Sequence, residues 1–192
     1  VDQIVMSPNK HLRSGKIPTK KYKKPNGQFY SQSGPKTPRR KVNFKDKEFV
    51  SWNVNRRYIE KYPQVQCTKK IELKHGLPCF YTVKIIESDP NYRFVISEKI
   101  NNIQFDGTEF LKDPLVKTIE DLFFKRKLPK NDIAQRLGKS TLEVQEILDK
   151  HKNLHNSITM AKKMGVSDLH QGQFIYAKRP DNGEMDWILA DW

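Results

Sequence analysis

The chain has 192 residues, of which 36% are hydrophobic and 30% are charged, and its formal net charge at pH 7 is +14. No apolar run approaches the roughly 20 residues that a membrane-spanning helix needs, so we expect no membrane span. Two cysteines, Cys67 and Cys79, are too few for a disulfide framework or a four-ligand zinc site. We expect packed thiols in a reducing compartment, and the sequence leaves open a single bridge between them.

The positive charge is concentrated at one end of the chain. Residues 1–45 contain 12 lysines and arginines and one acid, whereas residues 46–192 contain 24 basic and 21 acidic residues. A basic segment joined to a nearly neutral body is typical of proteins that neutralise phosphates, because each lysine or arginine contact releases condensed counterions. The distribution of charge therefore predicts that the chain binds nucleic acid.

Residues 1–45 are predicted to form an extended basic arm. Five prolines and three glycines interrupt this segment, so neither a helix nor a sheet is expected to run far. Aromatic rings lie among its cations and can stack on unpaired bases. The candidate RNA-binding residues of the arm are Lys20, Lys21, Tyr22, Lys23, Lys24, Phe29, Tyr30, Arg39, Arg40 and Lys41.

A second basic and aromatic stretch surrounds Arg56 and Arg57, with Trp52 and Tyr58 beside them. RNA binding and core packing of the two aromatic rings explain this stretch equally well. Arg56 and Arg57 are therefore also candidate RNA-binding residues.

Residues 46–110 are predicted to form an antiparallel β region. From Lys69 onward, apolar residues alternate with charged ones, and a break at 75–78 is followed by Tyr81, Val83 and Ile85 on one face. Residues 94–96 form another apolar run after a turn. We expect a meander of about three strands.

Residues 111–165 are predicted to be helical. Asp113 followed by Pro114 is a typical helix start, and Ser140 with Glu143 has the spacing of a capping box. After a first helix that ends at Pro129, we expect short helices at about 131–137 and 141–150, and one more before Gly165. Residues 166–192 then read as a hairpin, with strands at 174–177 and 185–192. The predicted fold is α+β.

The best local match to a motif is a helix-turn-helix at residues 132–149. Ala134 allows two helices to cross closely, Gly138 turns the chain, and Val144 is the expected buried residue of the second helix. Ser140, Thr141 and Gln145 would face bases if this helix entered a DNA groove. Three acids on or beside the same helix, Glu143, Glu146 and Asp149, would repel phosphate. The pattern therefore favours a helical pair that packs on protein.

The sequence contains no pattern that predicts an enzyme. The five histidines show no metal-ligand spacing, and His151 with His155 lacks a third ligand. Lys152 and Asn153 are expected to end the helix between these two histidines. No nucleophile elbow and no phosphate-binding glycine loop is present. We predict no catalytic residues, no metal, no cofactor and no small-molecule substrate.

In its overall build, the chain resembles an accessory ribosomal protein of a fungal mitochondrion. The resemblance rests on the basic proline- and glycine-containing arm, the small mixed body, the absent initiator methionine and the frequent Lys, Asn and Ile. It implies ribosomal RNA and neighbouring ribosomal proteins as partners. It also implies a location in the mitochondrial matrix, after removal of a presequence. A DNA-binding helix-turn-helix regulator, with the nucleus as location, and an interaction subunit of another assembly remain the alternatives.

Overall fold

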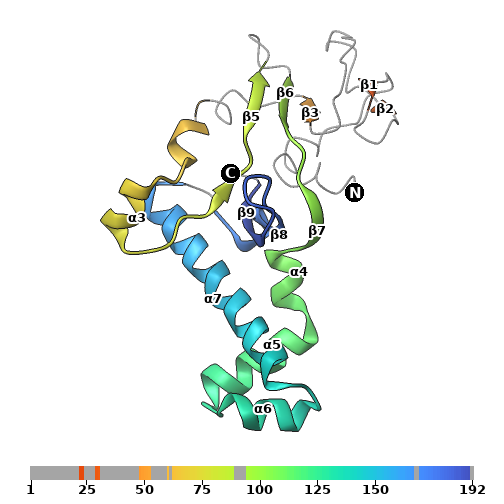
Figure 1. The fold of residues 1–192 in the computed structure, drawn as a ribbon, viewed down its shortest axis with the longest axis vertical. Coiled ribbons are helices and arrows are strands. Elements are labelled where there is room, and N and C mark those ends of the chain that lie inside the picture. The colour runs from red at the N-terminus through yellow and green to blue at the C-terminus, as the bar shows by residue number, and fades with distance from the viewer. Residues whose placement is uncertain are drawn as a thin grey trace.

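The computed structural model describes residues 22–23, 29–30, 48–52, 60, 62–88, 94–166 and 169–190. Its fold is α+β, as predicted. Figure 1 shows a helical unit at one end, a sheet near the middle and the strands β5 and β6 at the other end. Helix α7 runs from the helical unit toward the sheet and α3. No helix among these described residues is long and apolar enough to cross a membrane.

The strands of the described residues form three sheets. Their bounds are β1 (Tyr22–Lys23), β2 (Phe29–Tyr30), β3 (Glu48–Trp52), β4 (Tyr81–Thr82), β5 (Ile85–Ser88), β6 (Phe94–Glu98), β7 (Asn101–Asp106), β8 (Phe174–Lys178) and β9 (Met185–Leu189). β1 pairs with β2 antiparallel, and β3, β6 and β5 form an antiparallel sheet in that order. The pairing of β4 with β9 completes a four-stranded sheet of order β4-β9-β8-β7.

The predicted C-terminal hairpin is confirmed, and it supplies the two central strands of the larger sheet. β8 and β9 are antiparallel, with Tyr176 opposite Trp187. β7 pairs with β8 antiparallel, whereas β4 pairs with β9 in parallel, with Tyr81 beside Ile188. The expectation of a purely antiparallel sheet is therefore wrong for this pair. Segments from both ends of the body share one sheet.

The strand expected from Lys69 onward is a helix, α3 (Lys69–His75). Thr68 caps it by accepting a hydrogen bond from the Ile71 amide at 3.4 Å, and Gly76 ends it at a φ of +66°. Alternation suggested a strand because Ile71 and Leu73 are two residues apart. In the helix, Ile71 packs against the core and Leu73 is 74% exposed. The capping residues Thr68 and Gly76 thus favour a helix more strongly than the alternation of apolar and charged residues favours a strand.

The strand expected through Tyr81, Val83 and Ile85 is divided between two sheets. Tyr81 lies in β4 and packs with Val83 on one core cluster, whereas Ile85 lies in β5 and packs on another. The two strands belong to different sheets, so these side chains do not share one face. The strand expected at 94–96 is confirmed as part of β6.

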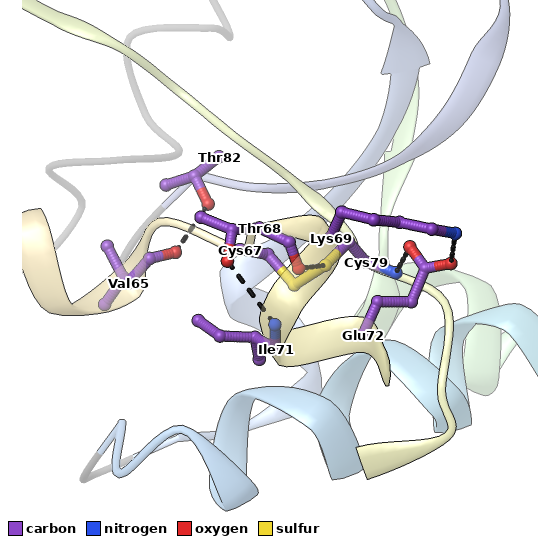
Figure 2. Close-up of a disulfide and its surroundings, with 8 residues drawn as sticks. All are labelled: Val65, Cys67, Thr68, Lys69, Ile71, Glu72, Cys79 and Thr82. Atoms are coloured by element: carbon purple, nitrogen blue, oxygen red, sulfur yellow. Dashed lines mark hydrogen bonds and ion pairs between the residues drawn. A yellow bond between two sulfur atoms is a disulfide. The ribbon is translucent and has the colours of Figure 1, made fainter. Parts of the chain in front are cut away.

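Cys67 and Cys79 form a disulfide, with their Cα atoms 5.5 Å apart. The expectation of packed thiols is therefore wrong. Figure 2 shows the bridge beside α3, where the Glu72 carboxylate accepts from the Cys79 amide at 3.4 Å and from the Lys69 ammonium at 2.7 Å. These contacts hold the chain that leaves α3 against the start of the helix.

The helical region begins earlier than expected. Its elements are α4 (Gly107–Lys112), α5 (Pro114–Glu120), the π-helical turn η4 (Asp121–Lys125), α6 (Lys130–Leu137) and α7 (Thr141–Lys163); short 3-10 turns lie at η3 (Tyr62–Val65) and η5 (Gln171–Gln173). The predicted start at Asp113 is confirmed for α5, since its carboxylate accepts from the Leu115 amide at 2.8 Å. α4 precedes it, capped by Asp106.

Helix α7 is continuous, although two short helices were expected in its place. Lys152 and Asn153, the expected helix end, are exposed on its outer side. Leu154, Met160 and Ala161 continue its buried face beyond that point. The apolar residues keep their helical spacing beyond this point, so the helix continues through the exposed polar residues Lys152 and Asn153.

The main core lies where α7 crosses the sheet, and the fully buried Trp187 is its largest side chain. The Trp187 indole donates a hydrogen bond to the Lys150 carbonyl of α7 at 2.9 Å. Its ring centroid lies 5.5 Å from that of Phe110 and 5.3 Å from that of Tyr176. Leu189 lies on the same side, as expected, whereas Ile188 packs on the other face of the sheet. Thus β9 joins the cores of both sheet faces.

We expect Trp187→Phe to lower the free energy of unfolding by about 2–4 kcal/mol, because it leaves a cavity and removes the hydrogen bond from the indole to the Lys150 carbonyl. Urea unfolding followed by far-ultraviolet circular dichroism measures the change. Leu142→Ala is the control, since Leu142 is 67% exposed and its loss should change stability by less than about 0.5 kcal/mol. Equal effects of the two substitutions would contradict the central role of Trp187.

The disulfide predicts no reactive thiol in the unreduced protein and two per chain after reduction. Reduction should lower the free energy of unfolding by about 3 kcal/mol, because it removes a constraint on the unfolded chain. Thiol titration and urea unfolding measure these two effects. The doubly substituted Cys67→Ser, Cys79→Ser variant should not respond to reductant. Two reactive thiols before reduction would show that the bridge is absent.

Candidate functional site

The predicted helix-turn-helix pair is present as α6 and α7. Ala134 and Val144 are buried where the helices cross, and Gly138 turns the chain at a φ of +64°. The Thr141 hydroxyl donates to the Asn131 side chain at 3.0 Å, which ties the start of α7 to α6. Residues from α5 and η4, among them Ile119 and Leu122, complete the small core of this three-helix unit.

The first turns of α7 are occupied by contacts within the protein. Ser140 caps the helix by accepting from the Glu143 amide at 3.1 Å, as its spacing predicted. The Gln145 amide donates to the Asp149 carboxylate at 2.7 Å, and Lys139 lies 3.9 Å from the Glu143 carboxylate. Two of the candidate base-reading residues, Thr141 and Gln145, thus already have partners. This arrangement fits a helix that packs within the protein better than a helix that contacts bases in a DNA groove.

A groove of about 450 Å³ opens on the same helical unit, between η4 and α7. Phe123 and Phe124 of η4 form one side of it, and Leu148 with its neighbours on α7 forms the other. Lys130, the first residue of α6, lies at its edge. A π-helical turn such as η4 is uncommon and often occurs at functional sites.

Aromatic rings give this groove an exposed apolar surface. Phe124 is 46% exposed. Its ring centroid lies 5.1 Å from that of Phe123, which is perpendicular to it, and 5.1 Å from the His151 imidazole, which is tilted by 36°. The Phe124 ring is therefore held between neighbours while part of it faces solvent.

The charges around the groove are unevenly paired. The His151 imidazole lies 3.5 Å from the Glu120 carboxylate, and Asp149 accepts from Gln145. Among the residues that the structure describes, neither Lys130 nor Lys152 forms an ion pair. The groove thus combines an aromatic surface with two cations that are available to an anionic ligand.

His151 and His155 both line this groove, because α7 continues past them. The expected helix end between them is wrong. Within residues 62–88, 94–166 and 169–190, no three His, Cys, Asp or Glu side chains come together as a metal site.

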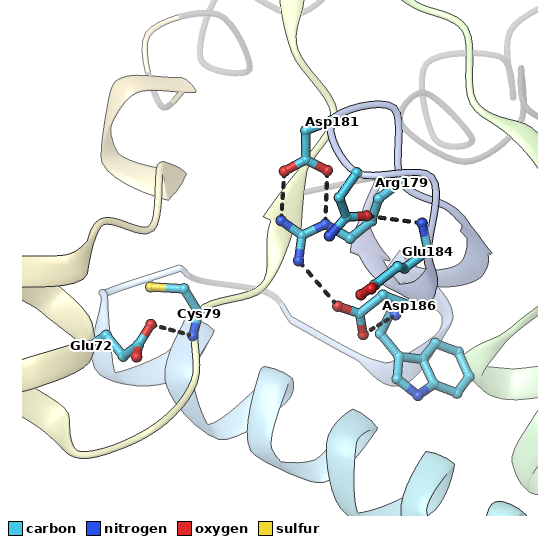
Figure 3. Close-up of polar contacts among 8 residues, drawn as sticks. Glu72, Cys79, Arg179, Asp181, Glu184 and Asp186 are labelled. Atoms are coloured by element: carbon cyan, nitrogen blue, oxygen red, sulfur yellow. Dashed lines mark hydrogen bonds and ion pairs between the residues drawn. The ribbon is translucent and has the colours of Figure 1, made fainter.

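A second polar cluster lies at the C-terminal hairpin (Figure 3). The Arg179 guanidinium binds both Asp181 oxygens, at 2.9 and 2.7 Å, and reaches Asp186 at 3.3 Å. The hydrogen bonds from Arg179 lower the pKa of Asp181. Arg179 also lies over the Tyr81 ring, 5.3 Å from its centroid. These contacts fix the turn between β8 and β9, and they leave Arg179 committed to protein partners.

Glu98 is partly buried, and Tyr81 contacts both this carboxylate and Arg179 of the cluster. One of its carboxylate oxygens accepts from the Tyr81 hydroxyl at 2.6 Å and from the Lys84 amide at 2.8 Å. Burial raises the pKa of Glu98 despite these two hydrogen bonds. Burial and the hydrogen bond to Glu98 raise the pKa of Tyr81. The pair joins β4 to β6 and thus connects the two larger sheets.

The described residues that line the groove include none of the sequence-predicted RNA-binding residues. Eight of them lie outside the described residues: Lys20, Lys21, Lys24, Arg39, Arg40, Lys41, Arg56 and Arg57. Tyr22 with Lys23 forms β1, and Phe29 with Tyr30 forms β2; Tyr22 pairs with Tyr30 and Lys23 with Phe29. The two short strands bring four candidate residues of the arm into one hairpin.

Sequence reasoning missed the groove residues Phe124, Lys130 and Lys152. A signal was present, because two adjacent phenylalanines precede the basic run 125–127 and the helix-breaking Pro129. An aromatic pair beside cations before a proline indicates an exposed turn. The partner side of the groove, on α7, could be located only with the helices in place.

Comparison with known proteins finds no matching family model, no matching curated protein and no matching solved structure.

Glu98 predicts a specific dependence of stability on pH. Its folded-state pKa is raised, so the folded chain holds this proton more tightly than the unfolded chain. Its contribution is fully present below the ordinary carboxyl pKa and is lost as pH rises through the raised pKa. Glu98→Gln keeps an acceptor for Tyr81 and Lys84 and removes the charge. The stability of this variant relative to the natural chain should therefore increase with pH.

Urea unfolding in steps from about pH 4 to about pH 8 measures this difference. Glu87→Gln is the control, since Glu87 is exposed on the neighbouring strand. A Glu98→Gln difference that stays constant across this range would contradict the raised pKa.

Proposed function

We propose that this chain is a structural RNA-binding component of a ribonucleoprotein particle. The observation that carries the proposal is the separation of charge, with 12 cations and one acid in residues 1–45 and near balance elsewhere. Such an arm neutralises phosphates without needing a particular base sequence. Its role is scaffolding, and it requires no catalytic group.

In this mechanism the arm and the body have different tasks. The lysines and arginines of the arm bind the RNA backbone, while Tyr22, Phe29 and Tyr30 stack on unpaired bases or wedge between them. The pairing of Tyr22 with Tyr30 across β1 and β2 supports this role, because it places two aromatic residues opposite each other. The folded body packs against neighbouring proteins.

The particle that we propose is a subunit of the mitochondrial ribosome, with ribosomal RNA and ribosomal proteins as partners. This choice rests on the resemblance in overall build, and the proposed location is the mitochondrial matrix. The Cys67–Cys79 disulfide counts against the reducing compartment that the sequence led us to expect, because structural disulfides persist mainly in oxidising compartments. Thiol titration on protein taken directly from cells therefore also tests the location.

A DNA-binding regulator is the second candidate, and the α6–α7 geometry favours it. Ala134, Gly138 and Val144 occupy the positions that a helix-turn-helix requires. The exposed side of α7 counts against it, because Glu143, Glu146 and Asp149 would meet the phosphates. In the RNA-binding proposal the arm holds the phosphates, and its sequence contains one acid, Asp2. An interaction subunit of another assembly would use the same exposed side for protein contacts.

The test replaces the seven arm cations with glutamine in the full chain. They are Lys20, Lys21, Lys23, Lys24, Arg39, Arg40 and Lys41. We expect affinity for ribosomal RNA fragments, measured by fluorescence anisotropy, to fall at least about tenfold. The slope of log affinity against log salt should flatten, because each lost phosphate contact removes about 0.7 from it.

The matched control removes the same charge from exposed lysines of the body. These are Lys70, Lys74, Lys112, Lys117, Lys162, Lys163 and Lys178. We expect a much smaller loss, and equal losses would sink the arm as the binding segment. Thr141→Ala with Gln145→Ala separates the second candidate, since a regulator loses its preference for one DNA sequence and a scaffold keeps its RNA affinity.

A further inference from the structure

We propose that the groove between η4 and α7 binds one unstacked nucleotide of single-stranded RNA. The base would lie on Phe124, and the flanking phosphates would contact Lys130 and Lys152. This inference rests on the proposed function, and it adds to that function a binding site on the folded body, separate from the arm.

The stacking surface is the exposed part of the Phe124 ring. Phe124 is 46% exposed, so a base that covers its ring would remove apolar surface from water, which favours binding. Phe123 and His151, each 5.1 Å away, hold the ring from two sides. A base would therefore meet a ring that is already oriented, which lowers the entropy lost on binding.

The size of the groove suits a single nucleotide. Its volume of about 450 Å³ falls within the range of small-ligand sites, roughly 300–1,000 Å³. Lining residues come from η4, α6 and α7, so three elements enclose the ligand. A helix of a protein partner would instead need a longer apolar channel, with anchors repeated along several turns.

The cations are placed for a backbone that passes across the groove. Lys130 and Lys152 lie on different helices, and neither forms an ion pair with any described residue. Lys127 follows η4 in the exposed turn and has a positive φ of 55°. Its neighbours Lys125 and Arg126 are within 3.9 Å of the Asp121 carboxylate, so they are less available to phosphate. Lys127, Lys130 and Lys152 thus remain available to an anion.

Asp149 gives the groove a preference among bases. This carboxylate lines the groove and accepts one hydrogen bond, from Gln145 at 2.7 Å. A carboxylate has about four acceptor positions, so others remain for an exocyclic amino group of a base. Adenine, cytosine and guanine carry such a group and uracil does not. The groove should therefore bind an oligo(A) segment more tightly than an oligo(U) segment.

The experiment uses the full chain and fluorescein-labelled single-stranded 12-mers of oligo(A) and oligo(U). Phe124→Ala should weaken oligo(A) binding about tenfold, the loss of one base–aromatic stack. Phe124→Trp should restore it, because the larger ring still stacks. Leu142→Ala, an exposed apolar residue outside the groove, and Lys162→Gln with Lys163→Gln, at the far end of α7, should leave it unchanged.

Crosslinking of oligo(A) that carries 8-azidoadenosine, followed by peptide mapping, locates the contact. Adducts on the peptides that contain Phe124 or His151 support the site. Adducts confined to residues 1–45, with Phe124→Ala binding as tightly as the natural chain, would overturn the groove and leave the proposed function standing. Failure of the full chain to bind either RNA would overturn both. Equal affinity for oligo(A) and oligo(U) would overturn the role of Asp149.

Discussion

The hydrogen bond from the Trp187 indole to the Lys150 carbonyl lies where the two halves of the molecule meet. It comes from β9, one of the two central strands of the four-stranded sheet, and reaches the middle of α7. The first half of α7 belongs to the three-helix unit. The Lys150 ammonium extends from the same residue over Tyr176, 4.9 Å from the ring centroid. Backbone and side chain of one helical residue are thus both held by the hairpin, so the position of the helical unit relative to the sheet depends on this contact.

Charge is distributed so that most acids of the body are committed to protein partners, whereas several cations are not. Asp181 and Asp186 bind Arg179, Glu143 lies beside Lys139, and Asp149 holds Gln145. Lys130 and Lys152 have no such partner among the described residues. An anionic polymer would therefore meet cations on the helical unit that form no ion pair with a described residue.

Elements that depend on local signals could be predicted from the sequence. Asp113 before Pro114, Gly138 at a left-handed turn, and the apolar faces of β8 and β9 lie within a few residues of the structure they specify. At α3 two local signals conflicted. The alternation from Lys69 onward predicted a strand, but Thr68, the residue just before it, caps a helix. The parallel pairing of Tyr81 with Ile188, the disulfide and the groove depend on residues brought together by the fold. No periodicity carries that information.

The parallel pair of β4 and β9 has a consequence for the order in which the chain folds. During synthesis the ribosome releases Tyr81 long before Ile188, so the four-stranded sheet cannot close until β9 has emerged as well. The three-helix unit draws its core from residues between Leu115 and Leu148 and can form earlier. Until β8 and β9 arrive, β4 and β7 are nascent strands without partners. The arrival of β8 and β9 therefore decides when the sheet closes and its earlier strands stop being a substrate for chaperones.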